Sequence, residues 1–191
     1  MKQAVEVGKY LDRLQAVAPE RFVFLDETGV HLGMSRSHAR GPAGQRIVEL
    51  GPPPRTGNCT IIGAMSLCGM IALAVLNQAL NALSFRAFVE QILLPVLKPG
   101  QIVVMDNLRV HHDAEALQVI RGAGCDVWFQ PAYAPETNPI EEAWHQLKSI
   151  LRRERPRTDE ELDRALVLAI DAITPENAYN YYRSAGVIDH C

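Results

Sequence analysis

Short apolar runs alternate along the chain with longer segments in which apolar residues recur at helical spacing. The runs at residues 21–25, 102–105 and 125–129 are rich in strand-forming residues, as is typical of buried strands. Residues 58–67 and 70–76 read as two consecutive strands with a turn at Cys68 and Gly69. Residues 30–57, rich in Gly, Pro, Arg and Ser, are predicted to be irregular.

Segments with helical periodicity lie between and after these strands. They span residues 84–96, 113–121, 138–154, 158–171 and 175–184, with a weaker pattern in 1–19. Ser84, Thr158 and Thr174 suit N-cap positions, and Pro95 would fray or bend the end of its helix. This order of strands and helices predicts an α/β fold, a mixed sheet flanked by helices.

The helix expected at 138–154 begins abruptly after a turn-rich segment. Asn138 is a good N-cap, Pro139 suits the first helical position, and Glu141 lies three residues after the cap, as in a capping box. One face of the helix is apolar and is formed by Ile140, Ala143, Trp144, Leu147, Ile150 and Leu151. We therefore expect Trp144 to be a core residue.

The polar residues of this helix divide between its two remaining sides. At about 100° per residue, Glu142 points almost opposite the apolar face, whereas Glu141 lies on its flank. The same flank carries His145, Lys148 and Arg152. An acid at the helix start followed by bases along its length suits a metal ion and then a phosphate backbone.

Composition and charge describe a single globular domain with two basic segments. The chain has 191 residues, 48% of them hydrophobic and 21% charged, and a net charge of −3, so the whole molecule is not an obvious polyanion binder. Basic residues nevertheless gather at two places, which contain Lys148, Arg152, Arg153, Arg155 and Arg157, and Arg36, Arg40, Arg46 and Arg55. Such runs are usually solvated faces, and DNA contact is the alternative.

Cysteine usage and hydropathy favour a cytoplasmic protein. The four cysteines are scattered without a Cys-x-x-Cys pair, which argues against a zinc knuckle or disulfide framework and fits a reducing compartment. The N-terminus lacks the pattern of a signal peptide. The most apolar stretch, residues 61–76, is too short to span a bilayer, so no membrane partner is expected.

Asp26 and Asp106 each follow an apolar strand. In layered α/β folds, ligand sites gather where strand ends open into loops. Two carboxylates brought together there would repel each other, and a divalent cation such as Mg²⁺ or Mn²⁺ is the usual remedy. Glu141 from a neighbouring helix would complete a site for two ions. Taken singly, each acid is as well explained by a turn or a helix cap.

Three sequence blocks resemble the signature blocks of mariner-like DDE transposases, in their bacterial insertion-sequence branch (insertion sequence 630 type). They are Phe-Leu-Asp-Glu-Thr-Gly at 24–29, Val-Val-Met-Asp-Asn at 103–107 and Tyr-Ala-Pro-Glu-Thr-Asn-Pro-Ile-Glu at 133–141. The 34 residues between Asp106 and Glu141, 107–140, are similar to the spacing in that branch. The resemblance covers residues 21–155 and implies a ribonuclease-H-like fold.

The resemblance also implies which residues form the site. Asp26, Asp106 and Glu141 would be the catalytic residues and the ligands of two Mg²⁺ or Mn²⁺ ions, with Asn107 and His112 as polar residues beside them. From the residues themselves, the adjacent His111 and His112 could suggest a metal site, but they cannot easily share one ion, and they are assigned to the helix start and to the surroundings of the metal ligands. Tyr133 would stack on a base or pack in a turn.

The function implied is metal-dependent DNA cleavage followed by strand transfer into target DNA. The expected partners are transposon-end and target DNA and a second copy of the chain in a homodimer. The residues expected to contact DNA are His145, Lys148, Arg152, Arg153, Arg36 and Arg40.

The N-terminal part departs from the family pattern. Family members usually carry a helix-turn-helix region before the catalytic domain, whereas only residues 1–25 precede Asp26. We expect a helix or linker at 1–20, the catalytic domain at 21–191 with C-terminal helices at 158–191, and end recognition by a missing region or a partner polypeptide. The alternatives are a nuclease of the same fold without joining activity, and a non-catalytic remnant acting as a DNA or protein interaction module.

Overall fold

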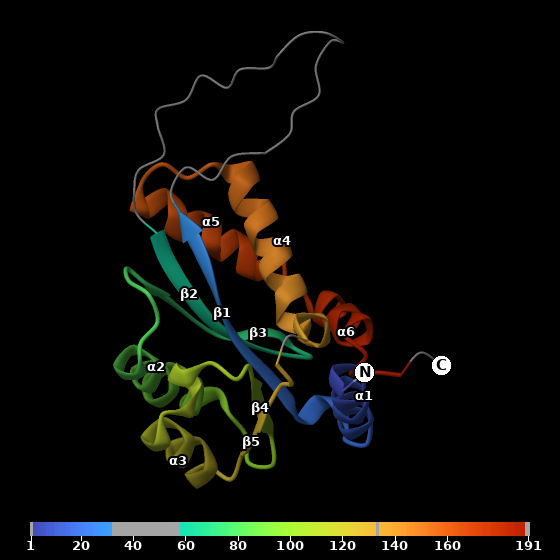
Figure 1. The fold of residues 1–191 in the computed structure, drawn as a ribbon. Coiled ribbons are helices and arrows are strands. Elements are labelled where there is room, and N and C mark those ends of the chain that lie inside the picture. The colour runs from blue at the N-terminus through green and yellow to red at the C-terminus, as the bar shows by residue number, and fades with distance from the viewer. Residues whose placement is uncertain (1, 32–57, 133, 190–191) are drawn as a thin grey trace, which may run out of the picture.

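A five-stranded mixed sheet lies between helices in the computed structural model of the chain, which describes residues 2–31, 58–132 and 134–189 (Figure 1). The strands are β1 (Phe22–His31), β2 (Asn58–Ser66), β3 (Gly69–Leu76), β4 (Ile102–Met105) and β5 (Asp126–Phe129). Their order is β3-β2-β1-β4-β5. The first three pair antiparallel, whereas β4 runs parallel to both β1 and β5. The predicted mixed α/β sheet is confirmed.

The two faces of the sheet pack against different helices because successive strand residues point to opposite sides. Phe22 and Phe24 belong to one core cluster, whose helices are α1 (Lys2–Gln15), α4 (Pro139–Glu154), α5 (Asp159–Asp171) and α6 (Pro175–Ser184). Val23 and Leu25 belong to the other, whose helical segments are α2 (Ala82–Phe88), the π-helical η2 (Val89–Leu93) and α3 (Ala114–Gly122).

The N-terminal helix α1 packs onto the first of these faces. Tyr10 and Leu14 are buried in its cluster. Gln15 Nε2 donates to the carbonyl of Gly186 at 3.0 Å, and the Arg13 guanidinium lies 3.5 Å from the Trp128 ring centroid. These contacts join α1 to both the C-terminal segment and β5.

The predicted end of the first strand at Asp26 is wrong. β1 continues to His31, and its second half pairs with β2, from Asp26 opposite Gly63 to His31 opposite Asn58. The hydrogen-bond ladder with β2 outweighs the turn preference of the residues after Leu25. Pairing with β4, in contrast, ends at Phe24 opposite Val104. Asp26 therefore lies within the pairing of β1 with β2, but beyond the end of the pairing of β1 with β4.

The start of α2 also differs from its prediction. Asn81, not Ser84, is the N-cap: its side chain accepts from the Ser84 N–H at 3.0 Å, and Ser84 Oγ accepts from the Asn81 N–H at 3.0 Å. This is a capping box. Helical backbone continues through η2 into the short 3₁₀ segment η3 (Leu94–Val96). The tightened final turn contains Pro95, as expected from its missing N–H.

The remaining helices follow the predicted boundaries closely. Thr158 and Thr174 cap α5 and α6 by accepting from Glu161 N and Asn177 N, each at 3.2 Å. Short 3₁₀ turns are η1 (Pro19–Arg21), η4 (Arg109–His112) and η5 (Pro135–Thr137). Within the described ranges, no helix is both long and apolar enough to cross a membrane. Several predicted site residues, Arg36, Arg40, Arg46, Arg55 and Tyr133, lie outside the described residues.

Candidate active site

Asp26 and Asp106 occupy equivalent positions on neighbouring parallel strands. The register runs from Phe22 opposite Ile102 to Phe24 opposite Val104, and two further residues along each chain lead to the two aspartates. Asp106 directly follows β4. Asp26, two residues after Phe24 in the same strand, points to the face that carries α4.

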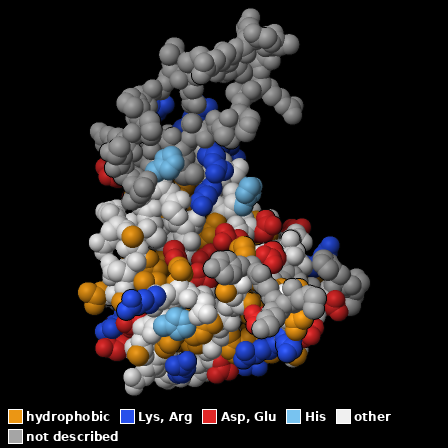
Figure 2. Space-filling model, viewed as in Figure 1, with side chains coloured by type: hydrophobic (Ala, Val, Ile, Leu, Met, Phe, Trp, Pro, Cys, Tyr) orange, Lys and Arg blue, Asp and Glu red, His pale blue; other side chains and the backbone are white. Residues whose placement is uncertain are grey.

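Glu141 reaches this place from α4. It is the third residue of that helix, which packs on β1 through Trp144 and Leu147 in the shared core. Its side chain is exposed, and it borders a cavity of about 240 Å³ lined also by Pro135, Glu136, Asn138, Glu142 and His145. Acidic side chains gather in the middle of this face of the molecule, with basic and histidine side chains above them (Figure 2).

The pKa of Asp26 is affected by the charges of both Asp106 and Glu141. Burial raises the pKa of Asp26, and the negative charges of Glu141, Glu27 and Asp106 raise it further, to about 7. Its side chain is only 7% exposed, and no Lys, Arg or His forms an ion pair with it among the described residues. A buried carboxylate surrounded by other carboxylates lacks a compensating cation.

Asp106 is held by His111, one of the two adjacent histidines that the sequence places beside the site. His111 is fully buried, and its Nδ1 lies 2.6 Å from Asp106 Oδ1, while its Nε2 lies 3.3 Å from Glu27 Oε2. Burial alone would lower the pKa of His111, but the hydrogen bond to Asp106 and the negative charges of Glu27 and Asp106 outweigh burial and raise the pKa to about 9. Both histidines lie in the turn η4, where the His111 side chain is buried and His112 is exposed.

The two predicted neighbours of the site, Asn107 and His112, contact each other. His112 Nε2 lies 2.6 Å from Asn107 Oδ1, and the His112 ring stacks on Phe129 with centroids 4.3 Å apart. Burial alone would raise the pKa of Asp106, but hydrogen bonds from His111 and Leu108 and the nearby charges of both histidines lower it. His112 therefore acts on Asp106 at a distance, whereas His111 touches it.

The capping box predicted at the start of α4 is wrong. Asn138 occupies the N-cap position but its side chain makes no capping hydrogen bond. That side chain is buried, and its Oδ1 has no hydrogen-bond partner among the described residues. The reciprocal bond of a capping box is also absent, because the Asn138 N–H donates to the Pro135 carbonyl at 3.0 Å and not to the Glu141 carboxylate. Only the Glu141 N–H bonds back, to the Asn138 carbonyl at 3.1 Å.

The three carboxylates suit a divalent metal ion by their chemistry rather than as a preformed cage. No group of three or more His, Cys, Asp and Glu side chains in the described part of the chain is arranged to hold an ion. The donors are nevertheless hard oxygens, which Mg²⁺ and Mn²⁺ prefer. Asp26 lacks a cation, and the exposed Glu141 side chain is not tied by an ion pair with any described residue.

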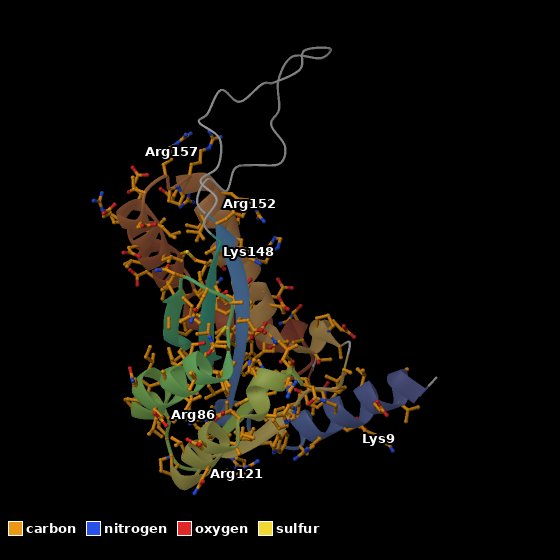
Figure 3. All side chains as sticks on the ribbon, turned by 60° about the vertical axis from the view of Figure 1, so that its left-hand side comes forward. Lys9, Arg86, Arg121, Lys148, Arg152 and Arg157 are labelled. Atoms are coloured by element: carbon orange, nitrogen blue, oxygen red, sulfur yellow. The ribbon has the colours of Figure 1, made fainter. Side chains whose placement is uncertain are left out.

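Basic side chains extend from this site along α4. Lys148 and Arg152 project from the same side of the helix, and Arg157 lies beyond its end (Figure 3). His145, one turn after Glu141, is exposed. Arg153 differs from these residues, because its Nε donates to the Glu154 carboxylate at 2.9 Å.

The comparisons with known proteins agree with this fold. A family model described as DDE superfamily endonuclease matches residues 21–163, and the chain belongs to that family. No curated protein matches the sequence. The specific insertion-sequence branch stays a prediction.

Solved structures of Mos1 transposase share the ribonuclease-H-like fold. The Mos1 paired-end complex with the left transposon end gives a TM-score of 0.79 at 17% identity, over 96% of this chain and 58% of that one. The mariner paired-end complex with Mn gives 0.77 at 16% identity, over 96% and 58%. The Mos1 catalytic domain gives 0.69 at 14% identity, over 97% and 87%. The chain thus spans 58% of the longer Mos1 chains.

Proposed function

We propose that the chain is the catalytic domain of a DNA transposase that cleaves DNA and joins the new end to target DNA, with Asp26, Asp106 and Glu141 as the catalytic metal ligands. The observation that carries this proposal is the buried Asp26 carboxylate, whose pKa is raised by burial and then by Glu141 and other acids, without a cation partner in the described residues. Such an arrangement favours binding of a divalent cation.

The metal ions, once bound, lower the pKa of the attacking water or 3′-hydroxyl and stabilise the leaving oxygen. The protein's contribution is to place three carboxylates. Asp26 is held by pairing with β2, and Asp106 by hydrogen bonds from Leu108 N and His111. Glu141 stands exposed on the first turn of α4, on the side from which DNA approaches in this proposal.

DNA is proposed to lie along the basic side of α4. His145, Lys148 and Arg152 follow Glu141 on this flank, and their contacts would be with phosphates, which gives salt-sensitive binding without sequence preference. Arg153 contributes less because Glu154 engages it. Arg36 and Arg40 complete the proposed DNA contacts. The similar Mos1 structures include complexes named for a transposon end and for Mn, which supports both DNA and divalent metal ions as ligands.

We further propose how the chain assembles with a second copy and with a part that recognises the transposon ends. A homodimer, and a helix-turn-helix region or partner polypeptide that recognises transposon ends, are supported by the sequence resemblance to the bacterial insertion-sequence branch. The proposed division of the chain into residues 1–20 and a catalytic domain at 21–191 rests on the same resemblance.

Replacement of Asp106 tests the proposed activity. We expect Asp106→Ala to reduce Mg²⁺-dependent cleavage of a DNA duplex about 10³-fold or more, because the metal ions supply several kcal/mol of charge stabilisation. DNA affinity should stay nearly unchanged. Asp126→Ala, at an exposed acid of β5 opposite Ile102, is the matched control. Undiminished cleavage by Asp106→Ala would refute the assignment.

A second assay separates transposase from nuclease. The wild-type chain is supplied with a pre-cleaved 3′ end and target DNA, and the products are resolved by size. Joined products are expected. Cleavage without joining would instead identify a nuclease, and the absence of both cleavage and metal binding would identify a non-catalytic interaction module.

A further inference from the structure

His111 bridges two acidic side chains, Glu27 of β1 and Asp106, which directly follows β4. Its ring is fully buried, with Nδ1 2.6 Å from Asp106 Oδ1 and Nε2 3.3 Å from Glu27 Oε2. The shorter contact has hydrogen-bond geometry, whereas the longer one is an ion-pair distance without it. Glu27 follows Asp26 in β1 and points to the opposite face of the sheet. The ring therefore connects the strand of Asp26 to the carboxylate of Asp106.

Both hydrogen bonds to the Asp106 carboxylate are made to the same oxygen, Oδ1. Oδ1 accepts from both the Leu108 N–H, at 3.0 Å, and His111 Nδ1. No hydrogen bond from the described residues reaches Oδ2. A carboxylate held twice through one oxygen is fixed in rotation and presents the other oxygen to an incoming ligand.

We propose that His111 is a positioning residue, which fixes the Asp106 carboxylate through Oδ1 and leaves Oδ2 as the oxygen that binds the divalent cation. This inference rests on the proposed function, because it takes Asp106 as a metal ligand. His111 itself touches neither the cation nor DNA. Ligand-orienting partners of this kind typically change metal affinity 10–100-fold when they are removed.

The surroundings of His111 restrict its ring to this orientation. The Phe85 ring of α2 lies 5.0 Å from it between centroids, and the His111 N–H bonds to the Leu108 carbonyl at 3.0 Å. The next residue of α2, Arg86, donates to the two carboxylate oxygens of Asp113 from Nε, at 3.1 Å, and Nη2, at 2.8 Å. Helix α2 thus contacts the His111 ring through Phe85 and the nearby Asp113 through Arg86.

The alternative is a histidine that only fills space in the core. Two substitutions separate the possibilities, because Asn places its amide near the position of Nδ1 and Gln near that of Nε2. His111→Asn keeps a donor for Asp106 and gives up the contact with Glu27. His111→Gln does the reverse. A space-filling role predicts equal effects of the two variants, whereas a positioning role predicts that only Asn retains function.

The test measures Mn²⁺ affinity of the full chain by calorimetry, together with the Mn²⁺ dependence of DNA cleavage. We expect His111→Gln and His111→Leu to weaken Mn²⁺ binding about 10–100-fold and His111→Asn to stay within about threefold of wild type. Phe88→Leu, at another buried residue of α2, is the control for lost stability, since it removes core packing without removing the donor or the ring that lies against His111. Its Mn²⁺ affinity should be unchanged below its unfolding temperature.

The outcomes distinguish this inference from the proposed function. If the wild-type chain binds Mn²⁺ and Asp106→Ala does not, but folded His111→Leu binds as wild type does, the positioning role is wrong and the catalytic assignment stands. If the wild-type chain binds no Mn²⁺, the proposed metal site itself is wrong, and the inference falls with it. Equal losses in His111→Asn and His111→Gln would also overturn the positioning role.

Discussion

Trp144 of α4 packs against the bare backbone of Gly63 in β2. A Cβ added to Gly63 would lie 2.7 Å from Trp144 Cη2 and 2.7 Å from Met70 Cε, closer than side chains can approach. Gly63 is also the residue that pairs with Asp26 across β1 and β2. The missing side chain therefore allows the first turns of α4, which carry Glu141, to approach the strand that carries Asp26.

Gly63→Ala is expected to destabilise the protein by about 1–3 kcal/mol, the usual range for adding a methyl group to a tightly packed site. Met70 can move its flexible end, but the Trp144 ring is fully enclosed, so α4 must shift. Urea unfolding measures the loss. Gly29→Ala is the matched control in β1, where an added Cβ meets nothing within 4 Å. Equal stability of the two variants would contradict this account of the packing.

Asp26→Asn is expected to stabilise the metal-free protein at alkaline pH. The pKa of Asp26 is about 7 in the fold and about 3.9 when unfolded. Between these two pKa values Asp26 is protonated in the folded state and ionised in the unfolded state. Its contribution to the free energy of unfolding therefore falls as pH rises from about 4 to about 7 and then levels off. Asn does not titrate. The variant should gain about 1–3 kcal/mol over wild type at pH 8, and the gain should fade toward pH 4.

Thermal unfolding across this pH range, with chelator present, measures the difference between Asp26→Asn and wild type. Asp163→Asn, at an exposed acid of α5, should show no such pH-dependent gain. Added Mg²⁺ should stabilise the wild type and not Asp26→Asn, because ligand binding to the native state raises stability by mass action. A constant difference between Asp26→Asn and wild type from pH 4 to 8 would contradict the raised pKa.

Much of the fold and the candidate acids could be predicted from local sequence. The strands follow from short apolar runs of strand-forming residues, and the helices α4, α5 and α6 follow from hydrophobic periodicity, since each of these helices buries one face. The extension of β1 to His31 could not be predicted, because it depends on pairing with β2, which begins 27 residues later, at Asn58. Local turn preference pointed the other way at Asp26.

The parts of the site that sequence missed depend on side-chain direction. Asn138 has the right identity and place for a cap, yet its side chain turns inward without a capping bond and its N–H donates to the Pro135 carbonyl, so Glu141 takes no part in a capping box. The sequence resemblance points to His112 as the polar residue beside the acids, whereas it is His111, in the turn η4, that lies between Glu27 and Asp106. Such choices are made by tertiary packing, to which a periodic pattern is blind.

Tyr182→Phe is expected to destabilise the protein by about 1–2 kcal/mol. The buried Tyr182 hydroxyl of α6 donates to the Phe22 carbonyl of β1 at 2.9 Å and lies 3.3 Å from the Met65 carbonyl. Without the hydroxyl, the buried Phe22 carbonyl loses this donor, and the free-energy cost of its desolvation is no longer offset by the hydrogen bond. Tyr179→Phe, at an exposed position of the same helix, should change stability by no more than about 0.5 kcal/mol. Chemical unfolding of both variants decides the matter, and equal losses would contradict it.

Lys148→Ala and Arg152→Ala are each expected to weaken DNA binding to a similar degree on any sequence. Both side chains project from one side of α4 (Figure 3), and Glu141 precedes them in the same helix, seven residues before Lys148. A cation that neutralises one phosphate releases about one counterion, so each variant should reduce the slope of log affinity against log salt by about 1. Arg121→Ala, on α3 at a distance from this side (Figure 3), is the matched control with the same loss of charge.

Fluorescence anisotropy with a labelled duplex over a range of salt concentrations measures these slopes. If Arg121→Ala lowered affinity and slope as much as Arg152→Ala, the effect would come from net charge alone and the α4 surface would not be the DNA-binding side. If Lys148→Ala changed affinity for one sequence only, the contact would be to a base rather than to phosphate. The double variant Lys148→Ala/Arg152→Ala should reduce the slope by about 2, because binding then neutralises two fewer phosphates and releases about two fewer counterions.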